Sequence, residues 1–283
     1  SNGADYQYVI TLIDTQNDKI KKEKKEVENE ITKSLFTKMK DAGFVMTPYV
    51  NSIKESPESG IVSFLETSRY STGYAALHHT VGYMPEAHMW KPYHLRVRGT
   101  YALLKSYVGL KPSLLKELSV AKIQAEENVK IQTEFPVSWK LDTTQYEMIE
   151  FLGYESSKKE SLVTGGLRLF YDHQKPFTKT IRHYNKFVPS LMLTKPEAYI
   201  VPQAWTKAIE LLKLNGVQMK ALDKDQSIEV EVYYIDSFDS SPSPYEGHYL
   251  HSNVKLLPKI QVLQFYKGDM MIETNQKSNR YII

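Results

Sequence analysis

In the first half of the chain, short extended runs alternate with apolar residues at helical spacing. The segment Tyr8 to Ile13 predicts a strand. A helix of about 20 residues is predicted next and ends at Gly43, because five apolar positions then share one helical face. These positions are Ile20, Val27, Ile31, Leu35 and Met39. The run Lys21 to Glu30 places opposite charges three or four residues apart, which is typical of a solvated helix surface.

The same order of elements then repeats. Val81 to Met84 predicts a second strand, and apolar residues recur at helical spacing after Pro92. Pro112 opens another amphipathic helix that extends to about Ile131. Strand followed by helix, twice, predicts an α/β part.

Beyond Val137 the periodicity changes from helical spacing to alternation of apolar and polar residues. Alternation is typical of half-buried strands, and it recurs in two short sets: Leu167, Leu169 and Tyr171, and Ile228, Val230 and Val232. One helix interrupts these strands, from Pro202 to Leu214. We therefore predict a boundary near residues 135 to 140, with an α/β domain over 1–135 and a β-rich α+β domain with one helix over 136–283.

Composition narrows the class of protein. The 283 residues are 41% hydrophobic and 24% charged, the balance of a folded globular chain. A net charge of +3, with no basic stripe, makes nucleic acid an unexpected partner. No apolar run approaches the roughly 20 residues that a transmembrane helix needs, and no signal peptide is recognised. The 20 tyrosines suit either ordinary strands or broad, partly wet binding surfaces.

Common catalytic motifs are missing from the sequence. Gly165-Gly166 is an isolated pair rather than a phosphate-binding loop, and no Gly-x-Ser-x-Gly motif occurs. Glu246, His248 and His251 lie in a Pro- and Gly-containing segment, where they are either ordinary loop polar residues or metal ligands. At least one histidine of the pair His78-His79 is expected to be packed and hydrogen-bonded, because the pair follows an apolar run.

Glu86 is the strongest candidate for chemistry. It lies at the end of an apolar strand, where the loops of α/β sheets gather functional groups. A carboxylate half withdrawn from water there could act as a general base. The alternative is an exposed carboxylate at a strand end. By the period of two, Glu86 and His88 would share one strand face.

Two runs around this residue resemble a known family. Arg69 to Leu77 (RYSTGYAAL) and Pro85 to Tyr93 (PEAHMWKPY) are similar to the last third of the catalytic domain of carboxypeptidase A-like zinc carboxypeptidases, in the Bacteroidetes branch. The opening SNGADYQY resembles the segment that follows the third zinc ligand there. Tyr199 to Trp205 and Pro244 to Val254 resemble the accessory β-rich region of those proteins.

The resemblance implies roles for particular residues. In the family, His-x-x-Glu and a later histidine hold zinc, and a strand-borne glutamate activates the zinc-bound water. Glu86 matches that glutamate, and Arg69, Tyr70 and Tyr74 match the loop that meets the substrate peptide. This chain has no His-x-x-Glu, however. Zinc is therefore expected in the intact family member and not in this chain.

We expect the chain to be the C-terminal portion, or a degenerate relative, of a periplasmic or secreted metallocarboxypeptidase that releases C-terminal residues from peptides. The chain alone would be inactive. The apolar end Tyr281 to Ile283 suggests a cut chain, and exposed sheet edges would favour self-association. The alternative is a non-catalytic protein that binds a peptide or glycan on a degenerate peptidase scaffold.

Overall fold

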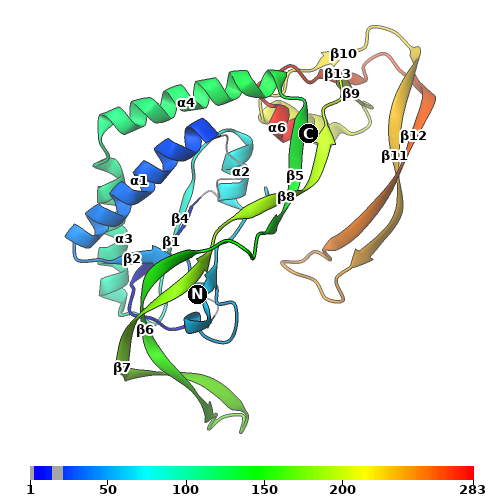
Figure 1. Cartoon of the computed structure of the whole chain (residues 1–283). Coiled ribbons are helices and arrows are strands. Elements are labelled where there is room, and N and C mark those ends of the chain that lie inside the picture. The colour runs from blue at the N-terminus through cyan, green and yellow to red at the C-terminus, as the bar shows by residue number, and fades with distance from the viewer. Residues whose placement is uncertain (1–2, 15–21) are drawn as a thin grey trace. The chain divides into compact units, whose positions relative to one another are not determined.

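The computed structural model describes residues 3–14 and 22–283, and side chains from residue 25 onward in the second range. The chain divides into two compact units, one formed by Ser1–Lys195 with Asn275–Ile283 and the other by Pro196–Thr274. Both contain helices and sheets (Figure 1), so the chain is of the α/β class. No helix among the described residues is long and apolar enough to cross a membrane.

The first unit contains most of the helices. In chain order its elements are β1 (Ile10–Asp14), α1 (Lys22–Asp41), β2 (Met46–Pro48), η2 (Pro57–Ser59), β3 (Ile61–Val62), α2 (Ser71–Leu77), β4 (Tyr83–Ala87), α3 (Tyr93–Val108), α4 (Pro112–Ile131), β5 (Glu134–Leu141), β6 (Glu147–Glu160), β7 (Leu167–Tyr184), β8 (Phe187–Thr194) and α6 (Asn279–Ile282). The predicted strands and helices of the first half are confirmed, with boundaries shifted by a few residues.

A three-stranded sheet of order β2-β1-β4 lies at the centre of the α/β part. Strand β2 runs parallel to β1, and β4 runs antiparallel to it. Ile10 and Leu12 of β1 pack with residues of α1, α3 and α4, and the buried helical residues are Ile31, Leu35, Met39, Leu103 and Leu114. The predicted apolar face of α1 is thus confirmed for its described members, and Ile20 lies outside the described residues.

A second core joins the N-terminal segment to a long hairpin. Strands β6 and β7 pair antiparallel, and β3 pairs parallel with β7. Tyr6 and Tyr8 are buried with Phe151 and Ile181 of this hairpin. The Leu152 N–H donates to Tyr8 Oη at 2.9 Å. The hairpin therefore packs with the chain's first residues.

This second core explains where the compact units divide. The change from helices to strands does fall between α4 and β5, as the periodicity predicts. The first unit nevertheless continues to Lys195, because β5 to β8 belong to it. Its C-terminal segment returns to α4, where Asn279 Nδ2 donates to the Val129 carbonyl at 3.1 Å.

The second unit contains β9 (Ala198–Val201), α5 (Thr206–Leu214), β10 (Lys220–Ala221), β11 (Gln226–Ser240), β12 (His251–Phe265) and β13 (Met270–Glu273). Strands β10, β13 and β9 form a small antiparallel sheet. Strands β11 and β12 form a separate two-stranded ribbon. The helix predicted from Pro202 to Leu214 is confirmed as α5, which begins four residues later.

Candidate functional site

Glu86 lies on β4, opposite Thr11 of β1, and is half-buried. Glu86 is the penultimate residue of β4, so its predicted place at the end of a strand is confirmed. Because β4 is antiparallel to β1, this end does not lie beside the carboxyl ends of β1 and β2. Burial raises the pKa of the neighbouring Tyr49 hydroxyl, and the negative charge of Glu86 adds to this effect. Glu86 therefore lies close enough to Tyr49 for their charges to interact.

The other three predicted residues lie around the start of α2. Arg69 and Tyr70 precede the helix and Tyr74 is within it, and all three are exposed. The Tyr74 ring lies 4.9 Å from the His78 ring, and the His78 ring lies 5.7 Å from Tyr281. Tyr74 thus contacts the end of α2, which in turn contacts α6. Glu86 instead interacts with Tyr49.

The remaining histidine predictions have different outcomes. His79 is buried, as expected for one member of its pair. Glu246 and His248 lie at the tip of the β11–β12 ribbon, where Tyr245 and His248 form a bridge, and His251 Nδ1 is 2.8 Å from Ser240 Oγ. Within residues 3–14 and 22–283, no three His, Asp or Glu side chains are grouped to hold a metal ion.

An ionic cluster that the sequence did not suggest forms around Asp5. The buried Asp5 carboxylate accepts hydrogen bonds from His88 Nε2 at 2.8 Å and from His173 Nε2 at 2.5 Å. Lys91 Nζ lies 3.7 Å from the same carboxylate and donates to the Tyr6 carbonyl. The cluster thus joins the N-terminal segment, the residues after β4, and β7.

These partners determine the ionisation of Asp5. Burial alone would raise its pKa, but hydrogen bonds from the two histidines and the positive charges of Lys91 and His88 outweigh burial and lower the pKa to about 2. A carboxylate that stays ionised and fully hydrogen-bonded is a poor proton acceptor near neutral pH. Its geometry is that of a structural clamp more than of a general base.

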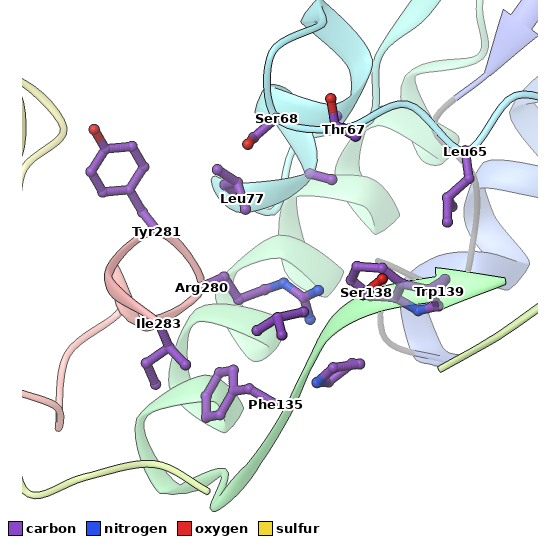
Figure 2. Close-up of a pocket in the computed structure, with 14 residues that line it drawn as sticks. Leu65, Thr67, Ser68, Leu77, Phe135, Ser138, Trp139, Arg280, Tyr281 and Ile283 are labelled. Atoms are coloured by element: carbon purple, nitrogen blue, oxygen red, sulfur yellow. The ribbon is translucent and has the colours of Figure 1, made fainter. Parts of the chain in front are cut away.

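A pocket of about 360 Å³ lies between α2, β5 and α6 (Figure 2). Leu77, Phe135 and Ile283 give it apolar walls, and Thr67 and Ser68 from the loop before α2 line it as well. Ser68 directly precedes Arg69, the first residue of the loop that was predicted to meet the substrate. The pocket and the predicted loop therefore share one edge.

A second cavity, of about 450 Å³, lies where the parallel strands β1 and β2 end. Asp14, Tyr49 and Ser63 line it together with His183. Ser63 Oγ lies 2.7 Å from His183 Nε2. Burial raises the pKa of Asp14, and it lowers the pKa of His183 to about 4, so His183 is neutral at neutral pH.

Comparison with known proteins adds no neighbour: no protein-family model, no curated protein and no solved structure matches the chain.

Gly73, in α2, is expected not to tolerate a side chain. A Cβ atom at this position would lie 2.0 Å from the Thr67 carbonyl oxygen and 2.5 Å from that of Glu66. Because backbone must move to relieve the clash, Gly73→Ala should lower the free energy of unfolding by about 1 to 3 kcal/mol. Urea denaturation measures this. Gly166→Ala is the control, since its nearest atom is 3.6 Å away; equal stability of the two variants would contradict the packing described for α2.

Proposed function

We propose that this chain is the C-terminal part of a zinc metallocarboxypeptidase-like protein that releases C-terminal residues from peptides. In this proposal Glu86 transfers protons during hydrolysis, and Arg69, Tyr70 and Tyr74 face the substrate. The observation that supports it is the position of Glu86. It lies half-buried near the end of β4, an edge strand of the sheet β2-β1-β4, in the stretch that carries the resemblance.

The free edge of β4 is compatible with a longer sheet. Among the described strands, β4 pairs with β1 alone. Unpaired edges of sheets offer N–H and C=O groups for another strand. We propose that strands from an earlier part of the family domain pair there, next to Glu86.

Zinc does not fit the described residues of this chain alone. No group of three ligating side chains occurs within the described part, and the sequence has no His-x-x-Glu. The roles proposed for residues of this chain are therefore proton transfer by Glu86 and substrate contact by Arg69, Tyr70 and Tyr74. In this proposal the zinc ligands come from outside the chain.

The decisive experiment begins with the coding sequence that precedes Ser1. We expect it to encode His-x-x-Glu and a further histidine, and we expect the longer protein to bind zinc and hydrolyse peptides from the C-terminus. Glu86→Gln should abolish hydrolysis at unchanged zinc content, whereas the exposed Glu117→Gln should not. Near-normal turnover of Glu86→Gln would remove Glu86 from the proposed role, and an upstream sequence without zinc ligands would contradict the peptidase assignment.

One observation favours the alternative of a peptide- or glycan-binding protein. The β11–β12 ribbon exposes Tyr233, Tyr234 and Phe238, and aromatic side chains with polar tips are common at binding surfaces. If the alternative holds, the tyrosine-to-serine variants at 233 and 234 would lose ligand while Glu86→Gln retains it. If the peptidase proposal holds, Glu86→Gln should lose turnover and the variants at 233 and 234 should retain it.

A further inference from the structure

Arg280 extends from the short helix α6 into the pocket between α2 and β5. Figure 2 shows its guanidinium directed between Phe135 and the side chains of Ser138 and Trp139. Its Nε atom is buried and has no hydrogen-bond partner among the described residues. A cation is therefore present in a pocket whose walls are largely apolar.

Nothing in the described part of the chain compensates this charge. No ion pair or hydrogen bond to the Arg280 side chain is found there. None of the described residues that line the pocket is acidic. Burial lowers the pKa of Arg280 to about 10, with no opposing effect of an anion. Even so, the guanidinium stays charged at neutral pH.

Arg280 is partly exposed, and within its guanidinium the Nε atom is buried without a partner among the described residues. Arginines withdrawn from water are normally paired, because a charge that loses part of its hydration needs a replacement. A guanidinium presents parallel N–H groups that match the two oxygens of a carboxylate. A pocket of about 360 Å³ is at the small end of the roughly 300 to 1,000 Å³ typical of ligand pockets. These observations point to a small anionic ligand.

We propose that this pocket binds a small monocarboxylate with an apolar body, whose carboxylate pairs with the Arg280 guanidinium. Leu77, Phe135 and Ile283 contact the apolar body. The absence of acidic lining residues disfavours a ligand with an ammonium group, so a free amino acid is a poor occupant. This site does not depend on Glu86 or on zinc, and it goes beyond the proposed peptidase function.

The test uses the full chain and phenylacetate as the probe, with binding measured by calorimetry and by saturation-transfer NMR. Phenylacetate should bind saturably. Phenylacetamide has the same shape without the charge, and phenylglycine adds an ammonium group to the phenylacetate skeleton; both should bind at least about tenfold more weakly. Phosphate alone should not compete, because it lacks the apolar body.

Variants then assign the charge to Arg280. Arg280→Met should weaken phenylacetate binding by about tenfold or more, and Arg280→Lys should retain part of it because a point charge remains. Arg98→Gln, an exposed arginine on α3, is the matched control and should bind normally. Arg280→Met should unfold at the same or a higher temperature than the wild type, since it removes a partly buried charge whose Nε atom has no partner among the described residues.

Three results would overturn the proposal. Equal binding of phenylacetamide would mean that the pocket recognises only the ring. Undiminished binding by a folded Arg280→Met would place the carboxylate elsewhere. Absence of phenylacetate binding at millimolar concentration, together with absence of binding by longer apolar monocarboxylates, would mean that the pocket does not accept this class of ligand.

Discussion

Asp5→Ala is expected to lower the free energy of unfolding by about 3 to 5 kcal/mol, because it leaves the enclosed His88 and the largely buried Lys91 without their anion. His88 Nε2 and His173 Nε2 both donate to Asp5, and Lys91 Nζ lies 3.7 Å away. His88 is fully enclosed, so water cannot replace the lost acceptor. Chemical denaturation of the full chain measures the change.

The sign of the pH dependence follows from the direction of the Asp5 pKa shift. The pKa falls from 3.8 to about 2 in the folded protein, so folding favours the ionised form. This contribution, roughly 2 kcal/mol, is fully present above about pH 5 and is lost as the pH falls through about 4 toward 2. In Asp5→Asn this loss should be missing from the stability profile below pH 5.

Asp41→Asn is the matched control, because Asp41 is exposed at the end of α1 in the same unit. Its stability should stay within about 0.5 kcal/mol of the wild type. A comparably small effect of Asp5→Ala would mean that the histidines and Lys91 are adequately hydrated without Asp5. The role of Asp5 as a clamp between the N-terminal segment and β7 would then be refuted.

Much of the local structure could be predicted from the periodicity of apolar residues. The face of α1 formed by Ile31, Leu35 and Met39 is buried as the 3.6-residue period requires. The strands and helices of the first half were also identified by proline and glycine at their ends. These signals are local, and so is the structure that they determine.

What could not be predicted depends on contacts between distant residues. Asp5 meets His88 across 83 positions and His173 across 168 positions of the sequence, and no local pattern marks such a pair. The direction of β4 relative to β1 could not be predicted for the same reason, since a strand's pattern is the same in either direction. Arg280 resembles any arginine near a chain end until its contacts with α2 and β5 are known.

The second large effect is expected at His183, which should make the protein lose about 3 kcal/mol of stability between pH 7 and pH 4. Burial lowers the pKa of His183 from 6.5 to about 4, opposed by the negative charge of Glu147 and reinforced by Lys186. The unfolded chain therefore takes up a proton at about pH 6.5, whereas the folded protein does so near pH 4. Stability is complete above that window and falls as the pH decreases through it.

His183→Gln should flatten the stability profile in this window, because glutamine does not titrate. Its amide can still form a hydrogen bond with Ser63 Oγ, which lies 2.7 Å from Nε2 in the wild type. His94→Gln, an exposed histidine on α3, is the control and should leave the profile unchanged. The measurement is the free energy of unfolding in urea at intervals from pH 7.5 to pH 3.5.

The two titrations separate because their windows differ. The difference between the wild-type and His183→Gln profiles from pH 6.5 to pH 4 reports His183, and the difference between the wild-type and Asp5→Asn profiles below about pH 4 reports Asp5. A His183→Gln profile as steep as that of the wild type would show that His183 is protonated in the folded protein, which requires water or Glu147 to stabilise its charge. The cavity at the ends of β1 and β2 would then hold an imidazolium beside Glu147, and the neutral form assigned to His183 would be refuted.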